Sequence, residues 1–272
     1  EGAKEVLAAL KKGEVGYAFV YENEEGQGLA LYQEQLGGVW IEASMAFLMQ
    51  ELLEIFQPFF ADSAYRKIGH DVKKDIRFLR SYGYNGFTAE FDTAIGAYIL
   101  NATGSSYEYD DIAATFLNET YPSQEEVFGK GRTKKAFAAL PEAERTAYGA
   151  RQAEIFFRAR KVMEERLAEN EQKSLFYDME MPLIYVLADM EKYGIKVDKA
   201  ALLAYQKRLG ESLDGMEEEI YALAGEKFNI NSPKQLGVIL FERLGLKGGK
   251  KTKTGYSTAA DVLEKLRTAH PI

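Results

Sequence analysis

Short apolar runs dominate the first seventy residues, and apolar positions with a helical period dominate the rest of the chain. The short runs are separated by glycine-containing or polar turns. They predict four β-strands, at residues 15–21, 29–32, 39–42 and 66–69. The first three follow one another through tight turns, so we expect them to pair in an antiparallel sheet.

The helical period predicts helices at residues 44–60, 71–82, 92–101, 107–118 and 141–173. From Ser174 onward the pattern is almost entirely helical, with a kink or break predicted at Pro182 because proline lacks an N–H donor. Asp198 and Ser232 stand where helix N-caps are expected. The chain is therefore predicted to be an α/β domain at residues 1–173, followed by an all-helical segment at residues 174–272.

Composition excludes several kinds of site. The 272 residues are 46% hydrophobic, which is typical of folded globular proteins. They include no cysteine and two histidines, which excludes disulfides, thiolate zinc sites and histidine-rich metal sites. The N-terminus does not read as a signal peptide, and no apolar run approaches the roughly 20 residues that span a bilayer. We therefore expect a cytoplasmic protein with no membrane partner.

The net charge of −8 is unevenly distributed. Residues 226–272 hold nine basic and four acidic side chains, whereas residues 1–225 hold 25 basic and 38 acidic ones. Within the basic part, a capped amphipathic helix leads into the run Lys-Gly-Gly-Lys-Lys-Thr-Lys-Thr-Gly-Tyr-Ser-Thr at residues 247–258. Lysines and hydroxyls on a flexible backbone suit sequence-independent contact with phosphates. The alternative interpretation is an ordinary solvated surface loop.

The order of residues in this stretch favours the phosphate-binding interpretation. It resembles the thumb of the bacterial DNA polymerase I enzymes, the family A DNA polymerases, in which an Asn-Ile-Asn-Ser-Pro-Lys-Gln-Leu helix precedes Lys-Lys-Thr-Lys-Thr-Gly-Tyr-Ser-Thr. The resemblance continues upstream through Glu180–Leu183 and Gly194–Asp198, and more loosely to the N-terminus. It implies contacts with the backbone of a primer-template duplex by five residues, Lys250, Lys251, Thr252, Lys253 and Ser257.

Residues 1–173 resemble the 3′–5′ exonuclease domain of the same family, which implies a ribonuclease H-like fold. That domain uses two divalent metals held by an Asp-x-Glu pair, a later aspartate and a Tyr-x-x-x-Asp pair. The matching positions here are Val20, Glu22, Asp75, Tyr148 and Gln152. Two carboxylates are thus replaced, so we expect a degenerate, structural domain without bound metal. If the site were active, Glu22 and Asp75 would be its metal ligands.

Taken together, the resemblance implies a fragment of a DNA-directed DNA polymerase, a nucleotidyltransferase of DNA replication and repair. No match to the family's polymerase active site occurs before Ile272, so we expect a fragment without that activity. We also expect the fragment to be a monomer. No cofactor is expected in the fragment, whereas the parent enzyme would use Mg²⁺. Two alternatives stay open: an active metal-dependent 3′–5′ proofreading exonuclease, and a protein-interaction module unrelated to DNA.

Overall fold

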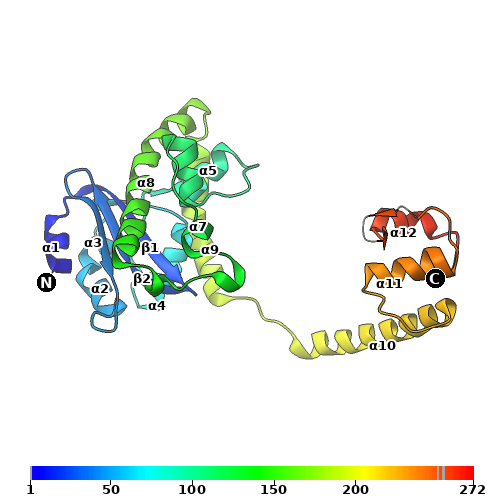
Figure 1. Ribbon diagram of the computed structural model, residues 1–272. Helices are drawn as coiled ribbons and strands as arrows, with labels where there is room; N and C mark the ends of the chain where they lie inside the picture. The colour runs from blue at the N-terminus through cyan, green and yellow to red at the C-terminus, as the bar shows by residue number, and fades with distance from the viewer. Residues whose placement is uncertain (1, 250, 253–254) are drawn as a thin grey trace. The chain divides into compact units, whose positions relative to one another are not determined.

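The computed structural model describes residues 2–249, 251–252 and 255–272, which form two compact units, Glu1–Gly194 and Ile195–Ile272 (Figure 1). The first unit therefore extends past the domain boundary expected near residue 173. It does so because the chain after that point packs back onto the α/β part, through the contacts described below. The assignment of the two parts to an exonuclease-like domain and a thumb segment stays a prediction.

Unit 1 is built on a five-stranded mixed sheet with the strand order β3-β2-β1-β4-β5. The strands are β1 (Gly13–Glu22), β2 (Glu25–Gln33), β3 (Gly37–Glu42), β4 (Tyr65–Gly69) and β5 (Phe91–Asp92). The pairs β1–β2 and β2–β3 are antiparallel, while β1–β4 and β4–β5 are parallel. The four predicted strands are confirmed in one sheet. The fifth was not predicted, because two residues carry no detectable period.

Helices cover this sheet, and α8 lies across it (Figure 1). The α-helices of unit 1 are α1 (Gly2–Ala9), α2 (Met49–Ile55), α3 (Gln57–Ala61), α4 (Val72–Ser81), α5 (Thr93–Leu100), α6 (Tyr109–Ile112), α7 (Gln124–Phe128), α8 (Glu142–Glu169) and α9 (Met181–Tyr193). Helix α8 approaches β1 so closely that a Cβ built on Gly16 would clash with the Ala153 carbonyl oxygen. A glycine is required at Gly16 for this packing.

Several helices differ from the predicted ranges. The helix expected from Ser44 begins at Met49, because the Ser44 hydroxyl accepts hydrogen bonds from the N–H groups of Ala46 and Phe47 in a turn. The same predicted helix is interrupted at Phe56, ahead of Pro58. Helices α1 and α7 were not predicted. Local hydrogen bonding by serine and the missing N–H of proline account for the two breaks.

Irregular turns join the remaining helices. They comprise the π-helical turns η1 (Ala113–Leu117) and η4 (Leu175–Glu180) and the 3₁₀ turns η2 (Gly131–Thr133) and η3 (Phe137–Ala139). The wide turn η4 leads directly into α9, which has Pro182 in its first turn. A helix irregularity predicted at Pro182 is thus observed, in the form of a π-helical turn before the proline.

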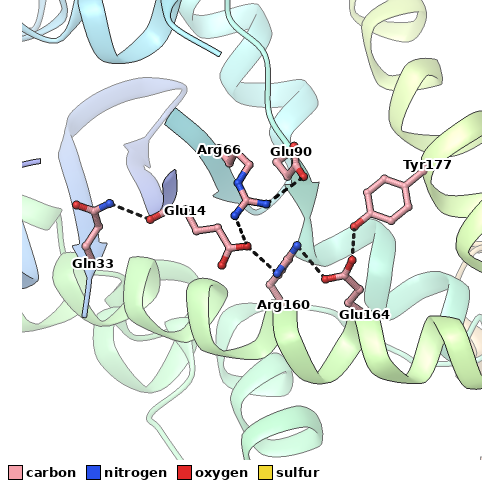
Figure 2. A network of polar contacts seen from close by, with 7 residues as sticks. All are labelled: Glu14, Gln33, Arg66, Glu90, Arg160, Glu164 and Tyr177. Atoms are coloured by element: carbon pink, nitrogen blue, oxygen red, sulfur yellow. Dashed lines mark hydrogen bonds and ion pairs between the residues drawn. The ribbon is translucent and has the colours of Figure 1, made fainter. Parts of the chain in front are cut away.

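The segment beyond residue 173 is held to unit 1 by polar contacts. Figure 2 shows Tyr177 of η4 donating to Glu164 of α8, which also pairs with Arg160 at 2.8 Å. Arg160 in turn pairs with Glu14 of β1 at 2.8 Å. On α9, Asp189 pairs with Arg80 of α4 at 2.8 Å. These contacts explain why the compact unit continues to Gly194.

Lys67 of β4 is fully buried in the core of unit 1. Its ammonium group donates to the carbonyl oxygens of Asp62 and Tyr65, both at 3.0 Å, and lies 5.5 Å from the Phe59 ring centroid. Burial lowers the pKa of Lys67 from 10.5 to about 8. The folded state therefore holds this lysine between two carbonyls and an aromatic ring at an electrostatic cost.

We expect Lys67→Met to lower the free energy of unfolding of unit 1 by about 2 kcal/mol at pH 7, because the carbonyl oxygens of Asp62 and Tyr65 lose the ammonium donor of Lys67. Above pH 8 the unfolded chain holds more protons at this site than the folded chain does, so the unmodified protein gains stability up to about pH 10.5. The variant lacks that gain. Urea unfolding between pH 7 and pH 10 measures both effects, with exposed Lys161→Met as the control. Parallel pH profiles for the two proteins would contradict this assignment.

The described part of unit 2 consists mainly of helices, with two short antiparallel strands. It contains α10 (Lys199–Ala224), α11 (Pro233–Gly237), the π-helical turn η5 (Val238–Arg243), β6 (Lys251–Thr252), β7 (Gly255–Tyr256) and α12 (Ala260–Leu266). The predicted caps are confirmed: Asp198 accepts from Ala201 N at 2.9 Å, and Ser232 accepts from Gln235 N at 3.4 Å. Among the described residues, no helix of either unit is long and apolar enough to cross a membrane.

Candidate functional site

The five positions matched to the exonuclease motifs line one pocket of about 240 Å³ in unit 1. Val20 and Glu22 come from β1, Asp75 from α4, and Tyr148 and Gln152 from α8. The three segments are more than fifty residues apart in sequence. The fold thus brings together the side chains that the motif comparison singled out.

Asp75 is the innermost carboxylate of this pocket and is 3% exposed. The Tyr21 hydroxyl donates to Asp75 Oδ1 at 2.7 Å. Burial raises the pKa of Asp75 well above its usual range, although the hydrogen bond from Tyr21 acts in the opposite direction. The buried Tyr17 hydroxyl lies close enough for the Asp75 carboxylate to add to the increase in the Tyr17 pKa that burial causes. Asp75 is therefore a buried carboxyl group whose charged form is disfavoured and whose hydrogen-bond donor is Tyr21.

Glu22 is engaged by a segment far along the chain. Its Oε1 atom accepts a hydrogen bond from Phe137 N at 3.0 Å. Phe137 is itself buried, with its ring packed edge-on against Trp40 and beside Tyr148. The carboxylate of Glu22 thus anchors the segment that precedes α8.

Tyr148 and Gln152 share one face of α8, as their spacing predicts. The Tyr148 ring packs at right angles against Tyr109 and Phe128, at centroid distances of 5.5 and 5.2 Å. Burial raises the Tyr148 pKa above its usual value. Gln152 Nε2 donates back to the Tyr148 carbonyl at 3.3 Å. This part of the pocket is therefore an aromatic cluster with a neutral amide beside it.

These residues do not fit a pair of divalent metal ions. Two hard cations need several free carboxylates. Val20 offers no oxygen, Glu22 accepts from a backbone N–H, and Asp75 is buried against Tyr21. Within the described part of the chain, no group of three or more histidine, aspartate or glutamate side chains could hold a metal ion.

Asp92 is bonded to the backbone of Asp71, a residue of the pocket lining, and to that of its neighbour Val72. Its carboxylate caps α5 by accepting from Ala94 N at 2.9 Å. It also accepts from Val72 N at 2.7 Å and from Asp71 N at 3.2 Å, at the start of α4. One buried carboxylate therefore accepts hydrogen bonds from N–H groups at the N-termini of two helices. Asp71 occupies the N-cap position of α4, but its side chain makes no capping bond.

The described part of the basic loop in unit 2 includes the antiparallel strands β6 and β7. The Tyr256 ring packs on Phe241 of η5 at a centroid distance of 5.0 Å. Ser257 Oγ accepts from Ala259 N at 3.5 Å. Lys250 and Lys253, two of the predicted DNA contacts, lie outside the described residues, and Lys251 and Thr252 are described only as strand backbone. The predicted contacts of these residues with DNA stay predictions.

Two further basic residues, Lys134 and Lys135, line the pocket of unit 1. They were not among the predicted site residues. The signal in the sequence is the run Gly-Lys-Gly-Arg-Thr-Lys-Lys at residues 129–135, with four basic side chains and no acidic one.

Comparison with known proteins identifies the family of both parts. The family model described as the ribonuclease H-like domain of DNA polymerase I matches residues 17–159, more than half of the chain. The model of DNA polymerase family A matches residues 199–272.

Similar proteins agree with the two family matches. The DNA polymerase I of Bacillus subtilis (strain 168) is 42% identical over 222 residues, covering 80% of this chain and 24% of that protein. The DNA polymerase I of Lactococcus lactis subsp. cremoris (strain MG1363) is 45% identical over 204 residues, covering 75% of this chain and 23% of that protein. The chain spans about a quarter of the length of the curated relatives it matches.

A solved structure is similar along almost the whole chain. It is the POL domain of Pol1 from M. smegmatis in complex with DNA primer-template and dNTP, with a TM-score of 0.71 and 27% identity. The similarity covers 99% of this chain and 44% of that one. With the family matches to both parts, it follows that the chain belongs to the family A DNA polymerases and that its first part has the ribonuclease H-like fold of DNA polymerase I.

Proposed function

We propose that the chain acts as part of a DNA-directed DNA polymerase in DNA replication and repair, in which unit 1 is a scaffold without nuclease activity. The parent enzyme would bind primer-template DNA in the cytoplasm as a monomer and use Mg²⁺ for polymerisation. The relatives and the Pol1 structure support the choice of DNA as partner. The observation that supports the loss of nuclease activity is that the two remaining carboxylates of the pocket are hydrogen-bonded within the protein.

The chemistry of the pocket supports this loss. Cleavage by two metals requires carboxylates that remain charged and free to coordinate the ions. Here one motif position is Val20 and another is Gln152, which leaves two carboxylates. Both of these already accept hydrogen bonds from the protein, Glu22 from Phe137 N and Asp75 from the Tyr21 hydroxyl. These contacts support the scaffold role, because each ties an element of the domain to its neighbour.

We expect the unmodified protein to leave 5′-labelled single-stranded DNA intact in the presence of Mn²⁺, at enzyme concentrations above that of the DNA. Gel electrophoresis of the products measures this directly. The Asp75→Ala variant serves as the control, because it removes one remaining carboxylate. Shortening of the DNA by the unmodified protein that Asp75→Ala abolishes would favour the alternative function, a working 3′–5′ proofreading exonuclease.

In unit 2 we propose that Lys250, Lys251, Thr252, Lys253 and Ser257 contact the backbone of a duplex. The match to the family A model over residues 199–272 and the basic composition of this part support the proposal. Such contacts hold phosphates and carry no sequence information.

Replacing Lys250, Lys251 and Lys253 by alanine is expected to weaken duplex binding about tenfold or more at low salt, equally for all sequences. It should also reduce the slope of log affinity against log salt by roughly 0.9 for each phosphate that no longer has a lysine beside it. Fluorescence anisotropy with labelled duplexes measures both quantities. A matched variant with Lys4, Lys161 and Lys192, three exposed lysines of unit 1, replaced by alanine controls for net charge. Unchanged affinity and slope in the Lys250/Lys251/Lys253 variant would place the duplex contacts elsewhere.

A further inference from the structure

One exposed dipeptide of unit 1, Asn85-Gly86, has no part in the proposed function. It lies between α4 and β5, within residues 84–89, which form no helix or strand. Asn85 is the one asparagine of the full sequence that is followed by glycine. Asparagine is a thermolabile residue, because the main-chain nitrogen of the next residue can attack its side-chain amide. Glycine hinders this attack least, since it has no side chain and a freely adaptable main chain.

The attacking atom, Gly86 N, is available in the folded protein. It has no hydrogen-bond acceptor within the residues that the structure describes. A Cβ built on Gly86 would have no atom within 4 Å, so the main chain has room to move there. The Asn85 amide donates through Nδ2 to the Gly83 carbonyl at 3.1 Å, in a bond exposed to water. Such a bond contributes little to stability, so the side chain is able to turn toward Gly86.

Asn231 offers the best comparison within the chain, because the serine that follows it is also small. In this case the attacking nitrogen is engaged, since Ser232 N donates to the Asn229 carbonyl at 2.9 Å. The Ser232 hydroxyl also caps α11, which fixes the main chain on the other side. Attack on Asn231 would first have to break the bond to Asn229. We therefore expect Asn85 to react faster than Asn231.

The segment that contains Asn85 is held at both ends. Tyr84 N donates to the Leu79 carbonyl at 3.0 Å, and Glu90 N donates to the Lys67 carbonyl at 2.8 Å. Between these two bonds, the Phe87 side chain is 4% exposed and belongs to the core of unit 1. A longer main chain at Asn85 would have to be accommodated between two fixed points, beside a buried ring. Such a change strains the packing of Phe87.

We propose that Asn85 deamidates spontaneously in the folded protein and yields isoaspartate, which destabilises unit 1. Gly86 N loses its proton to a base in solution and forms a bond to Asn85 Cγ. The Cγ–Nδ2 bond breaks, and the amide nitrogen takes up a proton and leaves as ammonia. Water then opens the resulting cyclic succinimide. Opening at Cγ gives aspartate, whereas opening at the main-chain carbonyl gives isoaspartate, in which the main chain runs through the side chain and is longer.

The test follows the full 272-residue chain by mass spectrometry of tryptic peptides during incubation at mildly alkaline pH. Trypsin releases residues 81–130 as one peptide, in which Asn101 and Asn118 serve as internal references. We expect loss of the amide at Asn85 before these two and before Asn231. The rate should rise with pH, because the attacking nitrogen must lose its proton. Equal rates at Asn85 and Asn231 overturn the proposal.

Two variants separate the chemistry from its consequence. Gly86→Ala keeps the asparagine but adds a Cβ that hinders the attack. The fold should tolerate it, since Gly86 has no positive φ and the Cβ meets no atom. Asn85→Asp carries the new charge without the longer main chain. The melting temperature of the unmodified protein should fall during incubation as isoaspartate accumulates, while incubated Gly86→Ala and fresh Asn85→Asp should melt like the fresh unmodified protein. An unchanged melting temperature in protein rich in isoaspartate would overturn the proposed destabilisation, and so would an equal decrease in Asn85→Asp.

Discussion

Replacing Asp92 by alanine is expected to lower the free energy of unfolding of unit 1 by about 3 to 4 kcal/mol. The side chain is 1% exposed and accepts from N–H groups at the first turns of two helices, α4 and α5. A single N-cap is worth about 1 kcal/mol, and each buried N–H left without an acceptor adds a further cost. The Asp92→Ala variant incurs both costs, the lost N-cap and the buried N–H groups without an acceptor.

Guanidinium unfolding followed by circular dichroism measures this loss. Ser123→Ala is the control within the same unit, because Ser123 caps only α7, at the surface, by accepting from Glu126 N at 3.2 Å. We expect that control to cost about 1 kcal/mol. Asp92→Asn keeps one oxygen acceptor and should fall between the two. An Asp92→Ala variant no less stable than Ser123→Ala would show that the second helix does not depend on this carboxylate.

Local sequence signals predicted much of this fold. The four strands with alternating or apolar runs were found, and so were the helix caps at Asp198 and Ser232, because a capping side chain bonds to the backbone two or three residues away. The second role of Asp92 was not predictable in this way. It depends on the parallel pairing of β4 with β5, which brings the start of α4 beside a residue twenty positions later.

The candidate site was likewise predictable from the sequence only in part. Motif spacing gave the five positions that line the pocket, from Val20 to Gln152. It did not give the partners that engage the remaining carboxylates, because the Phe137 N–H that binds Glu22 lies 115 residues away in sequence. Tyr21 likewise reaches Asp75 across 54 residues. The sequence thus indicated which side chains belong to the site. Whether each carboxylate is free to bind a metal ion depends on tertiary packing.

Restoring the two replaced carboxylates is expected to make the stability of unit 1 depend on metal. The double substitution Val20→Asp and Gln152→Asp places new carboxylates in the same pocket as Glu22 and Asp75. Val20 is 6% exposed, so without metal the variant should be less stable than the unmodified protein, because a buried charge lacks a partner. Mn²⁺ at about 100 times its dissociation constant should then add about 2.7 kcal/mol.

Thermal unfolding with increasing Mn²⁺ measures this linkage. The unmodified protein should show no increase in melting temperature, since Val20 and Gln152 offer no charged ligand. Adding Asp75→Ala to the double variant should remove the increase, because it takes away a ligand at the inner end of the pocket. An equal increase in the unmodified protein would mean that Glu22 and Asp75 suffice to bind metal, contrary to the scaffold role proposed for unit 1. No increase in the double variant would mean that the contacts with Phe137 and Tyr21 keep these two carboxylates from the metal, or that Val20 and Gln152 are not the replaced ligands.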